Sequence, residues 1–415
     1  MQPAKSTFPR LSLRWPAILG GMIFIAYLAS AIYVHREGFH AAKNGETPLF
    51  TDYTSLYAAS LLLRQEEASH LYLGRQMYAA TLQAAQAAYD GTLSDEQARQ
   101  VGFPPWLYPP MFIFFAAPLA YLSYFGAYIA WLAATALPYL AALRRILHDR
   151  EFWLFALATP PVFFNIMYGQ TGFLTAGLIA LGLALIATRP MIAGMLIGLA
   201  SCKPHFGILI PFALIAAGHW RTFVSASLSV VFLMLASALA FGIDVWYGFI
   251  GTVANNFAGF QAGAYKWQAM TSVLSFLHSL GLKPALAWYG QIVATLCALL
   301  LVVWAWRRSG DIDERGDLRC SILCSATLLA VPMVYLYDLV LMVPALAWLW
   351  ADMRQRGAAR WEPPALAICA AALLGLREFA WASGIQPGAA LVAVALWLAV
   401  RRLETARAHA LAGTK

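Results

Sequence analysis

The chain has 415 residues, of which 61% are hydrophobic and 12% charged, and its formal net charge is +8. Soluble domains carry about 25% charged residues, so this composition excludes an ordinary soluble protein and indicates a polytopic membrane protein. The basic residues stand in short clusters between apolar runs, which is typical of cytoplasmic loops at a membrane surface. No nucleic-acid partner is therefore expected.

The cysteines fall mostly inside apolar runs and show no metal-ligand spacing. We interpret them as small apolar packing residues and not as a disulfide framework: Cys202, Cys297, Cys320, Cys324 and Cys369.

The first apolar run, Trp15 to Tyr33, has roughly the 20 residues that a membrane-spanning helix needs. Leu28 to Ala31 weakly resembles a signal-peptidase site, but a retained helix is expected because the rest of the chain is polytopic. The basic stretch from Lys5 to Arg14 would then stay in the cytoplasm, and Asp52 would emerge on the other side.

Residues 34–108 form the first outer loop in this topology, and their apolar residues recur at helical spacing. One group is Leu56, Ala59 and Leu63, and a second is Leu71, Tyr78, Leu82, Ala85 and Tyr89. Helices of this kind lie in the interface plane and could roof a cavity that opens to lipid.

The remaining apolar runs predict an all-α, single membrane domain over residues 1–415, with about 11 to 13 transmembrane or re-entrant helices. The further segments expected are 109–122, 124–143, 152–168, 170–188, 191–201, 205–218, 222–242, 285–306, 320–337, 339–351, 363–381 and 388–401. Several are shorter than a full crossing, which indicates tilted, broken or re-entrant pieces. If segments 109–122 and 124–143 both crossed the membrane, Arg144 would lie on the non-cytoplasmic side, against the positive-inside rule. One of the two segments is therefore expected to be re-entrant, unless that rule fails locally.

The chain has no Walker loop and no glycine-rich dinucleotide motif after a strand, so a nucleotide-fuelled pump is a poor interpretation. A second outer loop, expected at about 243–283, is polar and aromatic and would suit sugar stacking and hydroxyl recognition. Its candidate residues are Asp244, Trp246, Asn255, Asn256, Gln261, Lys266, Trp267 and Gln268.

Five stretches in order carry a resemblance to a known family. They are TDYTSLYAAS, LYLGRQMYAA, FPPWLYPPMFIFFAAPLAYLS, TPPVFFNIMYGQTGFLTAGLIALGLAL and RPMIAGMLIGLASCKPHFGILIPFALIAAGHWR. Together they resemble glycosyltransferase family 87, whose members are membrane mannosyltransferases of the GT-C type that use a polyprenol-phosphate-mannose donor. The resemblance implies an inverting enzyme of the inner membrane, with its active site facing the periplasm or exterior.

The resemblance implies that Asp52 is the general base, since the family takes an acidic residue from the first outer loop. The alternative from the residues alone is that Asp52 caps the helix that begins at Tyr53. Because phosphate leaves already charged, a single carboxylate can suffice, whereas glycosidases need a second carboxyl group.

The leaving phosphate needs cations and hydrogen-bond donors, and Lys203 and His205 are the candidates for donor phosphate binding. Pro204 breaks the helix within an apolar hairpin, where a charge is costly without a partner. Lysine could instead extend to the membrane interface, and His205 could be a core residue.

Three further residues are candidates for binding sugar or acceptor: Tyr108, Gln170 and Asp338. Gln170 could instead be a hydrogen-bonding residue between helices, and Tyr108 an interfacial anchor. Asp338 is a secondary candidate, because family members often carry a histidine near a proline in a late span. Here that place reads VPMVYLYDLV, and this departure puts a transferred partner role in doubt.

The function expected is transfer of a hexose, mannose by the resemblance, from a polyprenol-phosphate donor to a glycolipid or glycan acceptor within a lipid membrane. No cofactor is expected and no metal is demanded, because the donor carries one phosphate. A secondary transporter or lipid-glycan flippase is the alternative, but it would show mid-membrane charges and repeats that relate two halves of the chain. The third possibility is a relative of these enzymes that has no catalytic activity and acts as an assembly partner.

Overall fold

The computed structural model describes residues 15–46, 51–94, 96–97, 101, 105–261, 265–307 and 312–412. The basic stretch Lys5 to Arg14 lies outside the described residues. The described chain is helical, without β-strands, apart from one isolated bridge between Met270 and Tyr335. The all-α prediction is therefore confirmed for this part of the chain.

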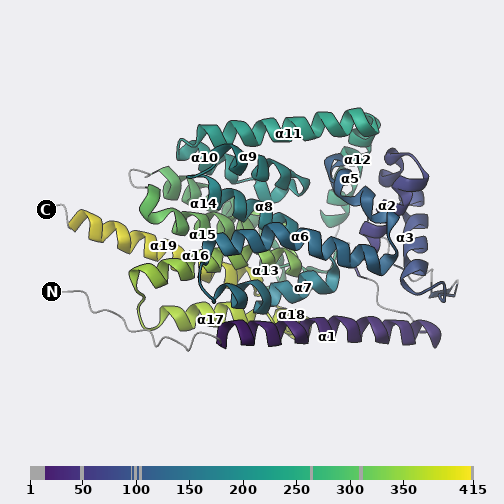
Figure 1. Cartoon of the computed structure of the whole chain (residues 1–415), viewed down its shortest axis with the longest axis horizontal. Coiled ribbons are helices and arrows are strands. Elements are labelled where there is room, and N and C mark those ends of the chain that lie inside the picture. The colour runs from purple at the N-terminus through teal and green to yellow at the C-terminus, as the bar shows by residue number, and fades with distance from the viewer. Residues whose placement is uncertain are drawn as a thin grey trace.

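The helices of the first half are α1 (Trp15–Lys43), α2 (Tyr53–Gln65), α3 (Gly74–Ala88), α5 (Ile113–Ala116), α6 (Tyr124–Ile146), α7 (Pro160–Tyr168), α8 (Gly172–Leu185), α9 (Pro190–Leu199) and α10 (Ile210–Ala216). Those of the second half are α11 (Trp220–Phe241), α12 (Asp244–Gln261), α13 (Val273–Ser279), α14 (Pro284–Arg307), α15 (Ile312–Ala330), α16 (Met342–Arg356), α17 (Glu362–Ala372), α18 (Leu376–Ser383) and α19 (Gly388–Ala412). In Figure 1, α2, α3 and α12 gather at the right-hand end of the bundle, and α19 lies toward the left.

Helix α1 is longer than the sequence indicated. It continues ten residues beyond Tyr33 to Lys43, because the stretch that follows contains no proline and its one glycine, Gly38, keeps a helical backbone. Gly45, just after the helix, adopts a positive φ of 78°. The helical assignments in the first outer loop are confirmed by α2 and α3. The buried face of α3 is, however, formed by Met77 and small residues such as Ala84, while Tyr78 is only partly buried.

Small residues let the central helices approach one another closely. Gly177 of α8 lies against the backbone of Tyr139 in α6, and a Cβ there would come within 2.4 Å of the Tyr139 nitrogen. Gly194 of α9 meets Ser225 of α11 in the same way, where a Cβ would lie 2.5 Å from the Ser225 Cβ. Close backbone contact through glycine and serine is typical of helices that pack within a membrane.

Five described helical segments are long and apolar enough to cross a membrane, and a sixth is possible if α17 and α18, bent by 65°, form one broken span. Four apolar segments of 10–17 residues are shorter, among them Pro110–Tyr121. That segment consists of three short helical pieces, which suits the re-entrant alternative for 109–122. The larger count of 11 to 13 membrane segments stays a prediction.

The second outer loop is mostly helical, and the sequence analysis had not assigned a helix there. Residues 244–261 form α12 because their apolar side chains recur at helical spacing, and Phe249 packs against Tyr72 with ring centroids 6.1 Å apart. Gly248 allows this contact, since a Cβ there would lie 2.9 Å from the Tyr72 Cβ.

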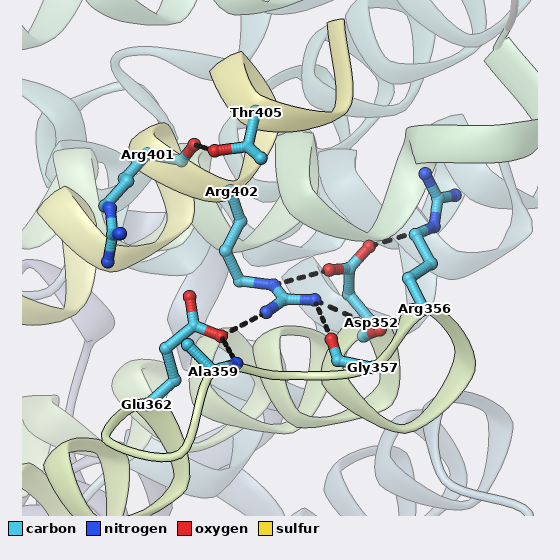
Figure 2. Close-up of polar contacts among 8 residues, drawn as sticks. All are labelled: Asp352, Arg356, Gly357, Ala359, Glu362, Arg401, Arg402 and Thr405. Atoms are coloured by element: carbon cyan, nitrogen blue, oxygen red, sulfur yellow. Dashed lines mark hydrogen bonds and ion pairs between the residues drawn. The ribbon is translucent and has the colours of Figure 1, made fainter. Parts of the chain in front are cut away.

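A buried charge network ties α16, α17 and α19 together (Figure 2). The Arg402 guanidinium donates to Asp352 at 2.7 Å, to Glu362 at 2.6 Å and to the Gly357 carbonyl at 2.8 Å. Asp352 is also paired with Arg356 at 3.2 Å. Since both carboxylates are almost fully buried, removal of Arg402 would leave two charges without their main partner.

We expect Arg402→Met to lower the free energy of unfolding by about 3–5 kcal/mol, the usual cost of removing one partner from a buried ion pair. The matched control is Arg401→Met, because the neighbouring Arg401 is exposed and stacks on Trp361 at 4.5 Å. This contact contributes only about 0.5–1 kcal/mol at an exposed site. Unfolding of both variants in the same detergent measures the difference, and equal losses would contradict the role of the network.

Candidate functional site

Asp52 stands at the N-terminus of α2, but its side chain makes no capping hydrogen bond to that helix. It accepts a hydrogen bond from Gln170 Nε2 at 3.0 Å instead, across 118 residues of chain. The structure therefore gives no support to the alternative in which Asp52 serves only as a helix cap.

Gln170 is held in one orientation by two donors. The Tyr108 hydroxyl donates to Gln170 Oε1 at 2.8 Å, and the Thr171 backbone N–H donates to the same oxygen at 3.2 Å. With the carbonyl oxygen so occupied, the amide nitrogen faces Asp52. Tyr108, Gln170 and Asp52 thus form one chain of hydrogen bonds.

The turn that carries Gln170 depends on two glycines. Gly169 ends α7 in the left-handed conformation (φ 61°), and a Cβ there would lie 2.6 Å from the Tyr53 Cβ. At Gly172, the first residue of α8, a Cβ would lie 2.5 Å from both the Asn165 Oδ1 and the Tyr337 carbonyl oxygen. Both sites therefore exclude larger residues and bring α2 and the Tyr337 segment close to Gln170.

Lys203 and Asp338 form a buried ion pair. Lys203 lies at the break after α9, where the backbone leaves helical geometry (φ −132°, ψ 72°), as predicted from Pro204. Its Nζ is 2.5 Å from Asp338 Oδ1 and 5.1 Å from the centre of the Tyr337 ring. The two residues are 8% and 4% exposed, so the ion pair is covered by protein on almost all sides.

Asp338 belongs to the 3-10 helix η8 (Leu336–Leu341), which leads into α16. Its second carboxylate oxygen accepts the Tyr335 backbone N–H at 3.0 Å and so fixes the start of η8. The sequence predicted Asp338 as a residue that binds sugar or acceptor, and this role stays a prediction. The contact with Lys203 is a feature that the sequence analysis missed.

His205 lies two residues beyond Lys203 and interacts with it electrostatically. Its ring is half-buried and packs on Phe206 with centroids 4.5 Å apart. His205 belongs to the short helix η6 (Pro204–Gly207), and Lys203 is the residue that precedes this helix.

The surroundings of Asp52 change its acidity. Part of the side chain is accessible to solvent, but the protein around it displaces bulk water, and this desolvation raises the pKa of Asp52 above its ordinary value. The hydrogen bond from Gln170 and the charge of Lys203 lower that pKa, the charge of Asp338 raises it, and a hydrogen bond from Tyr337 lowers it. The net shift is upward, which brings the carboxylate closer to the range useful for a general base.

These interactions bring the six predicted site residues into one polar region among apolar helices. The region offers a carboxylate, a lysine, an imidazole and neutral hydrogen-bond groups. In the described part of the chain, no three His, Cys, Asp or Glu side chains gather as metal ligands.

One signal in the sequence could have revealed the ion pair. Lys203 and Asp338 are isolated charges in apolar stretches, and such residues within a membrane protein usually pair with one another. Asn165 gave no comparable signal, although its side-chain amide is fully buried beside this turn and has no hydrogen-bond partner among the described atoms.

The apolar helices define an integral membrane protein in which a carboxylate, a lysine and an imidazole gather in one polar region. A model of glycosyltransferase family 87 matches residues 106–332, more than half of the chain, and the chain belongs to this family. It is accordingly a membrane glycosyltransferase. No curated protein and no solved structure matches the chain.

The matched region contains Tyr108, Gln170, Lys203 and His205, but neither aspartate. The two acids are joined to it by direct contacts, Asp52 through Gln170 and Asp338 through Lys203.

We expect Lys203→Met and Asp338→Leu each to lower the free energy of unfolding by about 3–5 kcal/mol, because each leaves a buried charge unpaired. The double variant should recover most of this loss and retain a deficit of about 1 kcal/mol from the hydrogen bond to Tyr335. Thermal unfolding of the four proteins measures the coupling. If the losses of the single variants simply add in the double variant, the ion pair is not the stabilising contact.

Proposed function

We propose that this protein is an inverting glycosyltransferase of the GT-C type that transfers a hexose, mannose in our expectation, from a polyprenol-phosphate donor. The acceptor in this proposal is a glycolipid or an envelope glycan, and the reaction takes place on the non-cytoplasmic face of the inner membrane. The observation that carries the proposal is that Asp52, free of a capping role, is aimed by Gln170 and interacts with Lys203 across the same polar region.

In the proposed step, the acceptor hydroxyl oxygen forms a bond to the anomeric carbon of the hexose, and the bond from that carbon to the phosphate oxygen breaks. Asp52 accepts the hydroxyl proton, and the electron pair of the broken bond leaves with the polyprenol phosphate. Attack in line with the leaving group inverts the configuration at the anomeric carbon. Since the leaving group departs as an anion, no second acid is needed.

Lys203 and His205 would stabilise the phosphate as its charge grows. Lysine binds phosphate as a point charge, and an imidazole N–H can donate a further hydrogen bond. The pair with Asp338 keeps the ammonium group in place before the donor arrives, and the remaining polar groups of Asp338, Tyr108 and Gln170 could bind sugar hydroxyls.

The direct test is to incubate purified protein with radiolabelled polyprenol-phosphate-mannose and membrane lipid extract and to look for a new glycolipid. We expect Asp52→Asn to lower the transfer rate by about 10²–10⁴-fold, the usual contribution of a general base. The matched control is Asp90→Asn, which removes an exposed carboxylate after α3, at a positive φ of 49° that asparagine also adopts, and should leave the rate unchanged.

Asp52→Asn should not lower thermal stability. Because the pKa of Asp52 is raised in the folded protein, its stabilising contribution is present at low pH and is lost as pH rises through that pKa. At neutral pH the ionised carboxylate therefore costs folding free energy, which asparagine avoids. A large loss of stability with normal activity per folded molecule would mean that Asp52 is structural.

Gln170→Leu should lower the rate about tenfold, since a hydrogen bond to a charged group is worth about 1.5 kcal/mol or more. It should also move the acidic limb of the pH profile to higher pH, because the hydrogen bond from Gln170 lowers the pKa of Asp52. Tyr108→Phe removes the donor to Gln170 and should shift the limb less, in the same direction. An unmoved limb in Gln170→Leu would indicate that Gln170 only joins helices.

A further inference from the structure

Tyr337 connects the two charged groups on which the proposed function depends. It stands one residue before Asp338 in η8, within VPMVYLYDLV, the stretch where the sequence departs from the pattern of the family. The Lys203 Nζ lies 5.1 Å from the centre of its ring, and its side chain forms a hydrogen bond with Asp52. One side chain therefore contacts both the base and the cation of the proposed reaction.

The position of the Tyr337 ring is fixed by its neighbours. The ring stacks on Tyr335 with centroids 5.5 Å apart and an interplanar angle of 15°, and it meets Tyr168 edge-on at 5.9 Å. The residue is 9% exposed. Its backbone is confined as well, since a Cβ at Gly172 would lie 2.5 Å from the Tyr337 carbonyl oxygen. Aromatic pairs of this geometry are favourable beyond the area that they bury, so the ring has little freedom to move.

The Lys203 ammonium group contacts two aromatic rings as well as a carboxylate. The centre of the Phe206 ring lies 5.4 Å from Nζ, close to the distance of the Tyr337 ring, and Asp338 Oδ1 is the ion-pair partner at 2.5 Å. An aromatic face attracts a cation through its quadrupole and leaves the positive charge in place. The ring of Tyr337 therefore holds the ammonium group without cancelling the charge that a phosphate needs.

The hydroxyl of Tyr337 acts on the other charged group. An ionised carboxylate only accepts hydrogen bonds, so the tyrosine hydroxyl is the donor to Asp52. Asp52 thus receives two donors from different parts of the fold, the Gln170 amide from the turn before α8 and the Tyr337 hydroxyl from η8. A carboxylate has about four lone-pair sites, so two donors orient the group and leave it able to accept a further proton.

We propose that Tyr337 is a positioning residue that sets the separation of the base and the cation. In an in-line displacement the attacking oxygen and the leaving phosphate lie on opposite sides of the anomeric carbon, so the groups that serve them must be held at a fixed separation. Tyr337 does this with its two ends, since the ring face holds Lys203 and the hydroxyl holds Asp52. The inference rests on the proposed function and adds a residue to its site.

The hydroxyl is tested first without catalysis, by infrared difference spectra of the full chain in neutral detergent. The protonated-carboxyl band that Asp52→Asn lacks reports the titration of Asp52. Tyr337→Phe should raise the pKa of Asp52 and move this titration to higher pH, because the lost hydrogen bond stabilised the ionised form. Gln170→Leu should move it further, since the hydrogen bond from Gln170 has the larger effect, and the double variant furthest. The charges of Lys203 and Asp338, which also act on Asp52, are present in every variant.

The matched control for the hydroxyl is Tyr168→Phe. This variant keeps the ring that meets Tyr337 edge-on and removes a hydroxyl that does not donate to Asp52. It should leave the titration of Asp52 where it is in the unaltered protein. An unmoved titration in Tyr337→Phe, or an equal shift in Tyr168→Phe, would overturn the proposal.

Transfer kinetics then separate the two ends of the side chain. Tyr337→Phe keeps the ring face and should lower kcat about tenfold with an unchanged KM for the donor, because the base loses one of the donors that orient it. Tyr337→Leu removes both contacts and should also raise the KM for the donor at least threefold. Rates are compared per folded molecule, with the folded fraction taken from thermal unfolding of each variant.

Two kinetic results would contradict the proposal. One is a kcat of Tyr337→Phe equal to that of the unaltered protein, and the other is an unchanged KM for the donor in Tyr337→Leu. Absence of transfer by the unaltered protein with any polyprenol-phosphate donor would count against the proposed function, while the infrared titration would still report on the contact between Tyr337 and Asp52.

Discussion

The site depends on the ion pair between Lys203 and Asp338. It joins the break between α9 and α10 to the start of η8, two segments 135 residues apart that no continuous helix connects. An ammonium and a carboxylate in apolar surroundings must stay together, because separation would expose each to an environment that cannot solvate it. The pair therefore fixes the positions of His205 and Tyr337 as well.

A second constraint brings the first outer loop into the site. Asp52 stands at the start of α2, which is not among the described helices long and apolar enough to cross a membrane, and the glycine turn at Gly169 lets α2 approach Gln170 closely. Asp52 and Lys203 are therefore supported by different parts of the fold, Asp52 by α2 and Lys203 by the broken α9–α10 region.

The sequence predicted much of the fold because apolar runs, helical periodicity and Pro204 act locally. It identified α2 and α3 within a loop and the break at Lys203 for this reason. The sequence analysis placed the end of α1 ten residues early, because an apolar run shows which part of a helix contacts lipid and not where the helix ends. It did not assign α12 as a helix for the same reason, since this segment is less apolar than a membrane span. The candidate residues came from a resemblance, but their contacts depend on tertiary packing. No local pattern predicts that Asp338 pairs with Lys203 or that Gln170 faces Asp52.

The charge network around Arg402 has a consequence for biosynthesis. Asp352 and Glu362 precede their arginine by 50 and 40 residues, so both acids emerge from the ribosome before it. During that interval Arg356 can already pair with Asp352, whereas the ion pair of Glu362 in the described residues is with Arg402, so Glu362 must remain hydrated or protonated. Burial of Glu362 is therefore complete only after α19 has been made, and this arginine links the last helix of the chain to two helices made before it.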